Sequence, residues 1–299
     1  MSRRVAVRAA GLAVLAVGVV VGLTVYFSTQ KIPPCLVSNT PKWRAPTDAN
    51  VHRFELVVPD RALCFFDMDH DHELVGFVKL SGIEGISALA PRAGGRVALR
   101  YANGRGAVVD LASGRVRYGA DPPPPPSDAV VVRDPSADVE YVTRRGALGF
   151  RVFSLATHRL LHVVTFAGFT WNPRFGPNPP DHGLSLAPDR PELWVLDSPN
   201  SVVHLFDVSG LPNDPPRQIA DIRLSKPISG DENPCSRACG RIGSLLHSAD
   251  GRFVYVGDSG DVIDTRTRET VANLEALHNS RVQLEVDWVN GKAVFPRRS

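Results

Sequence analysis

The sequence predicts an all-β fold made of repeated four-stranded sheets, and three of its features support this prediction. A unit of about 45 residues recurs from residue 50 onward. Each unit holds β-rich runs separated by short polar turns, with a hydrophobic residue and then an aspartate or serine at the end of its third run. The chain also contains 25 prolines and 25 glycines, which is typical of many short strands joined by turns.

The residue that ends the third run marks successive units. The marked positions are Asp67, Asp110, Ser154, Asp207 and Asp264, with spacings of 43, 44, 53 and 57 residues. Four short strands at this period are typical of the blades of a β-propeller. We therefore expect a propeller of about five blades, with six as the alternative, over residues 50–299.

The strands can be placed within one unit and at the two ends of the chain. In the fourth unit, the four runs are "HGLSLAPD", "PELWVLDSP", "SVVHLFDVS" and "PRQIADIRLS". The C-terminal "RVQLEVDWVNGKAVF" supplies strands that no third run follows, and the N-terminal unit lacks clear early strands. Joining these ends in one mixed blade would close the ring and remove exposed sheet edges.

The first 49 residues differ from the repeats. Residues 1–8 form a basic segment with Arg3, Arg4 and Arg8, and Ala9–Phe27 is uncharged and almost wholly apolar. As a helix this stretch would span ~28 Å, about the thickness of a bilayer core. We expect a transmembrane signal anchor at 9–27 and a linker at 28–49, with a cleaved signal as the alternative. The arginines place the remainder on the extracytoplasmic side, periplasmic or at the cell surface.

The charge of the expected outer domain is balanced. The whole chain has 34 basic and 31 acidic residues, and without the three N-terminal arginines the two numbers are equal. Such a balance gives no support for binding to nucleic acid. We expect attachment to the membrane through the N-terminal helix and no nucleic-acid partner.

Four cysteines are the candidates for disulfides. In an extracytoplasmic chain the first interpretation of cysteines is disulfide bonding. Cys235 with Cys239 is the local choice, which would leave Cys35 with Cys64. A metal or thiol pair at "CSRACG" and free or differently paired thiols remain alternatives.

Acidic and histidine side chains gather in "FFDMDHDHELV", which contains Asp67, Asp69, His70, Asp71 and His72. The repeat places this stretch at the end of a third strand and in the following turn, where aspartates bond locally to the backbone. A calcium loop would need a glycine and a distal glutamate in addition. The main interpretation is a turn, and a divalent-metal site is the alternative.

Two further candidate sites lie in loops. His182, with Asp181 beside it, begins an inner strand of the fourth unit and is a candidate for a ligand or channel contact. Phe169, Trp171 and Phe175 in one Pro-rich loop are candidates for an interface. We find no motif of a hydrolase, a zinc protease, a phosphate-binding loop or a c-type haem protein, and expect neither catalytic residues nor a cofactor.

The repeats resemble a known family. "YVTRRGALGFRVFSL" is similar to the repeat of YVTN-type, YncE-like β-propellers, with Arg144 in place of the motif's asparagine. Stronger similarity to bacterial extracytoplasmic propellers lies in "DHGLSLAPDRPELWVLDSPNSVVHLFDVSGLP" and "HSADGRFVYVGDSGDVIDTRTRETVANL". The resemblance implies a propeller related to the β chains of amine dehydrogenases. Relatives usually have about seven units, and two are absent here between roughly Asp121 and Asp128.

Three functions follow as hypotheses. The first is a membrane-anchored propeller that binds another extracytoplasmic or membrane protein as an accessory subunit. The second is a propeller that binds a small ligand or metal in its central channel. The third is an oxidoreductase-associated, amine-dehydrogenase-like subunit whose redox cofactor belongs to a partner. Enzymatic activity of the chain itself is not expected, because no catalytic motif is present.

Overall fold

The computed structural model describes residues 35, 39–59, 61–81, 85–125, 130–143, 148–170, 183–226, 244–278 and 282–296. The chain divides into two compact units, residues 1–33 and 34–299, and all of the described residues belong to the second. Among them, no helix has the length and apolar character needed to cross a membrane. The expected anchor at 9–27 lies outside the described residues.

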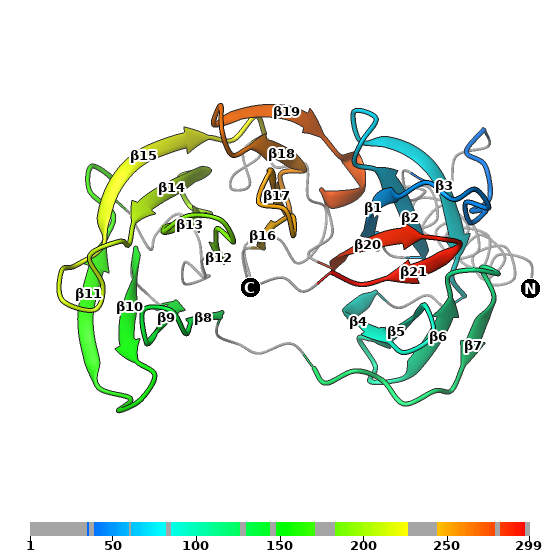
Figure 1. Ribbon diagram of the computed structural model, residues 1–299, viewed down its shortest axis with the longest axis horizontal. Helices are drawn as coiled ribbons and strands as arrows, with labels where there is room; N and C mark the ends of the chain where they lie inside the picture. Colours follow the sequence, from blue (N-terminus) through cyan, green and yellow to red (C-terminus); the bar gives the residue numbers. More distant parts are fainter. Residues whose placement is uncertain are drawn as a thin grey trace, which may run out of the picture. The chain divides into compact units, whose positions relative to one another are not determined.

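Five antiparallel sheets make up the described structure (Figure 1). The second sheet contains β4 (Ile86–Arg92), β5 (Arg96–Tyr101), β6 (Gly106–Asp110) and β7 (Val116–Tyr118). The third contains β8 (Val131–Asp134), β9 (Val139–Thr143), β10 (Gly149–Ser154) and β11 (Leu160–Thr165). The fourth contains β12 (Leu184–Leu186), β13 (Glu192–Asp197), β14 (Val202–Asp207) and β15 (Arg217–Arg223). The fifth contains β16 (Leu245–His247), β17 (Phe253–Val256), β18 (Asp261–Asp264) and β19 (Glu269–Asn273), followed by the 3-10 helix η3 (Glu275–Leu277).

The remaining sheet mixes the two ends of the second unit. This mixed sheet has the order β21-β20-β1-β2-β3, with β1 (His52–Val57), β2 (Ala62–Asp67), β3 (Glu73–Lys79), β20 (Gln283–Val289) and β21 (Lys292–Val294). β1 and β20 pair antiparallel, with Phe54 opposite Val286. The predicted all-β fold and the predicted mixed sheet are therefore confirmed. The five sheets fit a propeller of five blades, and the described residues form no sixth sheet.

The repeating aspartate or serine ends the third strand of every sheet, at the last residue of β2, β6, β10, β14 and β18. In four of these strands the register toward the outer strand shifts just before that residue. Such a bulge inserts one extra residue and increases the local twist. The repeat seen in the sequence therefore corresponds to a repeated backbone geometry.

Four hydrophobic clusters join the sheets. They connect the second sheet to the mixed sheet, the mixed sheet to the fifth, the fifth to the fourth, and the fourth to the third. Within the described part of the chain, no such cluster joins the second sheet to the third. The expected closure of the ring is therefore supported at four junctions and not at the fifth.

Part of the expected linker belongs to the folded unit. Trp43 is buried, its indole stacks on Phe65 with ring centroids 3.7 Å apart, and its Nε1 donates to the carbonyl of Leu111 over 2.7 Å. Its backbone amide donates to the carbonyl of Phe77. Trp43 lies within the expected linker 28–49, yet it packs in the core of the folded unit, because there its ring has a buried apolar site and its Nε1 a hydrogen-bond partner. The bounds of the linker stay a prediction.

Candidate functional site

The acidic stretch after β2 is one of several similar turns. One carboxylate oxygen of Asp67 accepts from the amide of Asp69 over 2.9 Å, and the other lies 3.0 Å from Nδ1 of His70. Asp110 and Asp264 cap their turns in the same way, through the amides of Ser113 and of residues 266 and 267. The arrangement is that of an Asp-capped turn.

The other side chains of this turn point to different partners. Asp69 accepts from Arg53 Nε over 3.0 Å, and His70 is 74% exposed. His72 is buried, its Nε2 lies 3.0 Å from the Tyr255 hydroxyl of the fifth sheet, and its ring packs edge-on against Phe253. Among the residues that the structure describes, no three His, Cys, Asp or Glu side chains come together as a metal site would require.

The two histidines of this turn are expected to respond differently to substitution. His72→Asn removes the bond to Tyr255 and the packing on Phe253, so it should lower the free energy of unfolding by about 1–2 kcal/mol. Burial, and next the charge of Arg252, lower the pKa of His72 to about 4. As the pH falls from about 6.5 to about 4, the unfolded chain therefore takes up a proton that the folded chain does not, and stability falls.

Thermal unfolding midpoints at about pH 7.5 and about pH 4.5 test this expectation. His72→Asn should lower the midpoint at the higher pH and lose part of its decline with acid. His70→Asn is the matched control and should leave the midpoint at the higher pH unchanged, because its ring is exposed. Equal effects of the two substitutions would show that His72 has no special packing role.

The cysteines are described in part. Cys35 and Cys64 form a disulfide, and both are buried next to the fifth sheet. Cys235 and Cys239 lie outside the described residues. The disulfide ties residue 35 to β2 and fits an oxidising compartment.

Most of the candidate residues in loops lie outside the described residues, namely Trp171, Phe175, Asp181 and His182. Phe169 is described and half-buried, and its ring centroid lies 4.6 Å from that of His204. It packs against the cluster of the third and fourth sheets. Part of the surface of Phe169 is therefore buried in packing within the chain.

A buried histidine bridges two carboxylates in the fourth sheet, and no motif in the sequence indicates it. His204 Nδ1 lies 2.6 Å from Asp221, and its Nε2 lies 3.2 Å from Asp197. Each ring nitrogen of His204 therefore faces one carboxylate oxygen. Asp197 also accepts from the amide and side chain of Asn200. The contacts made by the imidazole and by Asp197 suit a structural hydrogen-bonded triad between β13, β14 and β15.

A cavity of about 730 Å³ lies beside the second sheet, lined in part by Tyr101 and Tyr118. Both hydroxyls bond to the backbone of Ser81, over 3.1 and 2.6 Å. Burial, and next Tyr118, raise the pKa of Tyr101 to about 12, so this phenol is neutral at physiological pH. A side chain at Gly106 would meet the carbonyl of Ala120 at 2.1 Å, so this lining position requires glycine. The cavity has no catalytic pair of the nucleophile–base kind.

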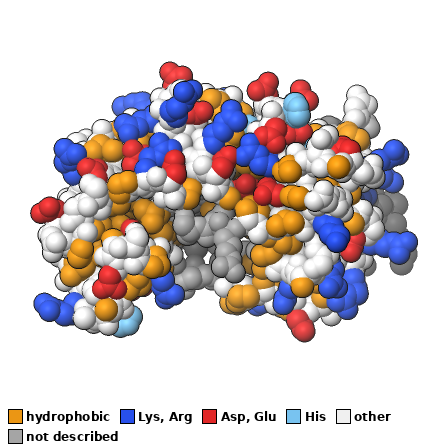
Figure 2. Space-filling model, in the orientation of Figure 1, with side chains coloured by type: hydrophobic (Ala, Val, Ile, Leu, Met, Phe, Trp, Pro, Cys, Tyr) orange, Lys and Arg blue, Asp and Glu red, His pale blue; other side chains and the backbone are white. Residues whose placement is uncertain are grey.

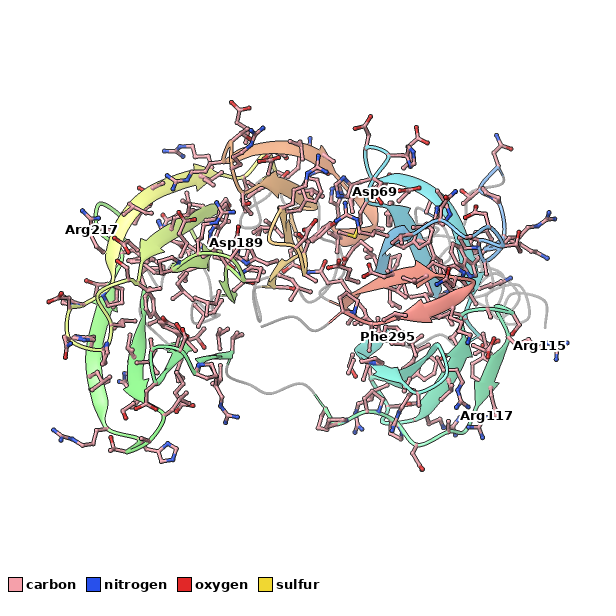
Figure 3. All side chains as sticks on the ribbon, in the orientation of Figure 1. Asp69, Arg115, Arg117, Asp189, Arg217 and Phe295 are labelled. Atoms are coloured by element: carbon pink, nitrogen blue, oxygen red, sulfur yellow. A yellow bond between two sulfur atoms is a disulfide. The ribbon has the colours of Figure 1, made fainter. Side chains whose placement is uncertain are left out.

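The most distinctive surface is an arginine-rich face of the second sheet. Strand register places four arginines on one side, which we call the basic face: Arg92 on β4, Arg96 and Arg100 on β5, and Arg117 on β7. Arg100 is half-buried and the other three are exposed. Figure 2 shows blue side chains over this sheet, and Figure 3 shows Arg117 extending from β7 on the side opposite to the mixed sheet.

The basic face occupies positions that bury apolar side chains elsewhere in the fold. When the sheets are aligned on the repeating aspartate, Arg96, Ala98 and Arg100 of β5 correspond to Phe54, Leu56 and Val58 of the mixed sheet, which pack against the next sheet. The corresponding Trp194 and Leu196 of the fourth sheet pack against the fifth. The alternation of Arg96 and Arg100 in "RVALRY" was the available signal, because strand residues two apart share a face.

The third sheet also carries charge on the side that would meet the second. Glu140 and Val142 correspond to Leu193 and Val195, which are fully buried in the fourth sheet. Glu140 lies 3.6 Å from Arg133, and the neighbouring Arg151 is exposed. Packing these two faces together would remove arginines from water without enough carboxylates to pair them, which is unfavourable. This explains why the described residues of the second and third sheets form no shared apolar cluster.

Comparisons with known proteins give a distant structural likeness. No protein-family model matches the chain, and no curated protein matches it. Among solved structures, dihydro-heme d1 dehydrogenase NirN in complex with DHE is 13% identical with a TM-score of 0.35, over 82% of this chain and 48% of that one. A protein from Lactobacillus plantarum is 16% identical with a TM-score of 0.35, over 75% of this chain and 66% of that one. The chain thus spans about half the length of the first, and a likeness at this level does not extend to activity or ligand.

Proposed function

We propose that this chain is a membrane-anchored, extracytoplasmic propeller of the YVTN-repeat type that binds another protein as an accessory subunit of a membrane complex. The basic face is the observation that carries this proposal. At the equivalent strand positions the remaining sheets bury apolar side chains against a neighbouring sheet. The basic face instead exposes charged side chains, which suit recognition of a partner. The second sheet therefore keeps one face available for a partner.

The location in the cell is part of the proposal. The Cys35–Cys64 disulfide supports an oxidising compartment. The sequence of Ala9–Phe27, preceded by three arginines, supports an anchor with the propeller outside the cytoplasm.

The hypotheses of a ligand- or metal-binding propeller and of an oxidoreductase-associated subunit rest on other residues. The ligand-binding hypothesis uses the channel candidates His182 and Asp181, which lie outside the described residues, and the oxidoreductase hypothesis relies on a redox cofactor of a partner chain. The cavity beside Tyr101 and Tyr118 is the described feature that suits a small ligand. These hypotheses therefore become outcomes of the same experiment.

Purification of the full-length tagged protein from its native membranes in mild detergent tests the proposal. We expect a protein partner in fixed stoichiometry, detected by native mass spectrometry, with its binding domain on the extracytoplasmic side. Exposure of the tagged propeller to protease in intact cells or spheroplasts gives its side of the membrane. A monomer that carries a bound metal or chromophore and no partner would support the other hypotheses and contradict this one.

A further inference from the structure

We propose that the basic face binds an acidic polypeptide segment of the partner, in which Asp or Glu side chains pair with Arg92, Arg96, Arg100 and Arg117. This inference rests on the proposed function and names the chemistry of its partner. Arginine suits carboxylates because its planar guanidinium can donate two parallel hydrogen bonds to them.

The arginines form an array that an extended acidic chain can match. Arg92 lies directly opposite Arg96, and Arg100 is four residues further along β5, about 13 Å away at the rise of a strand. Arg117 lies two strands from β5, or about 10 Å across the sheet. In an extended segment, alternate side chains are about 7 Å apart and point to one side. Acidic residues at alternate positions would therefore reach several of these arginines at once.

Three of the four arginines have no carboxylate opposite them in the sheet, and the fourth, Arg96, lies opposite Asp110. Arg96 Nε donates to the carbonyl of Ala93 over 3.0 Å, and an Nη of Arg100 donates to the carbonyl of Pro123 over 3.1 Å. Asp110 is the one acidic residue on the four strands of this sheet, and it accepts from the amide and hydroxyl of Ser113. It also shares the basic face with Arg96, and the hydrogen bonds from Ser113 and the charge of Arg96 both lower the pKa of Asp110. Among the described residues, no salt bridge joins any of the four arginines to an acid. Most of the positive charge of the basic face is therefore not compensated by the sheet's own acidic residue.

The surface between the arginines favours a polypeptide over a lipid or a nucleic acid. Small apolar side chains, Ala88, Ala90, Ala98 and Val108, share the face, where Ala98 is buried and the other three are half-buried. The exposed aromatic of this sheet, Tyr118, pairs with Ala107 and so lies on the opposite face. The basic face thus lacks the large apolar residues that insert into a membrane and the aromatic rings on which bases stack.

The test measures binding of a fluorescently labelled poly-glutamate peptide to the full-length protein in detergent. The variant combines Arg92→Gln, Arg96→Gln and Arg117→Gln, and the matched control combines Arg159→Gln, Arg223→Gln and Arg266→Gln, which are exposed arginines of other sheets. Both triples change the net charge equally. We expect the dissociation constant of the first to rise about tenfold and that of the control to rise by about twofold or less. Equal thermal midpoints would show that both variants fold.

Three results would overturn this inference. Equal loss in the two triples would show that the peptide senses only net charge. The unaltered protein could bind phosphatidylglycerol vesicles or single-stranded DNA more tightly than poly-glutamate. If the basic-face variant lost that binding, the face would recognise another polyanion. If the variant with all three basic-face arginines replaced still recovered the partner from native membranes in the same stoichiometry, the basic face would not be part of the interface. The proposed function would then stand without this inference. Recovery of no partner by the unaltered protein would count against the proposed function itself, whatever the peptide result.

Discussion

A chain that lacks residues 282–299 is expected to aggregate or be degraded rather than fold with one sheet loose. This deletion removes β20, which pairs with every residue of β1. It also removes Val286 and Trp288, which are 0% and 1% exposed in the cluster shared with the second sheet. Burial of each large apolar side chain is worth roughly 1.5–3 kcal/mol, and a whole domain is stable by only roughly 5–15 kcal/mol. The unpaired edge of β1 would in addition be open to other chains.

A chain that ends at Asn290 is the matched control. It loses β21 but keeps β20, and Lys292 and Val294 of β21 are exposed. We expect this shorter deletion to lower the thermal midpoint and to leave a soluble chain that unfolds cooperatively. Soluble expression and calorimetry of both chains decide the matter. If the chain that lacks 282–299 unfolded as cooperatively as the full one, β20 would be an appendage to the sheet.

Trp43→Ala is expected to destabilise the protein by about 3–5 kcal/mol, the usual range for removing a large buried aromatic side chain. The indole stacks on Phe65 and meets Trp288 edge-on with ring centroids 6.0 Å apart. Its Nε1 bond to the carbonyl of Leu111 links it to the second sheet. The side chain of Trp43 thus contacts both the mixed sheet and the chain that follows β6 of the second sheet.

Trp43→Phe separates the two contributions of this residue. Phenylalanine keeps an aromatic ring against Phe65 and loses the bond to Leu111, so we expect a smaller loss, of about 1–2 kcal/mol. Urea unfolding followed by far-UV circular dichroism measures both variants. If Trp43→Ala lowered the free energy of unfolding by less than about 1 kcal/mol, residues 39–46 would not contribute to the stability of the folded unit and would act as a linker.

The repeat and the strands follow from the sequence because their signals are local. The runs around Trp194 and Leu205 show the apolar content and length of buried strands, and each is closed by a turn residue a few positions away. The aspartates that end the third strands, such as Asp207, cap their own turns within two or three residues. The sharing of one sheet by both ends was also accessible, because the C-terminal strands had no third strand of their own.

Tertiary structure alone decided the features that join residues far apart in the chain. His72 and Tyr255 are 183 residues apart, and Trp288 bonds to the carbonyl of Pro46 across 242 residues. The basic face had a local signal in Arg96 and Arg100, yet alternation cannot say which face of a strand meets a neighbouring sheet. The fold supplied that answer by showing that the equivalent positions Trp194 and Leu196 are buried against another sheet. The sequence by itself thus determined the strands and their repeat, because these depend on neighbours along the chain, while packing in space decided which faces are buried and which are left to a partner.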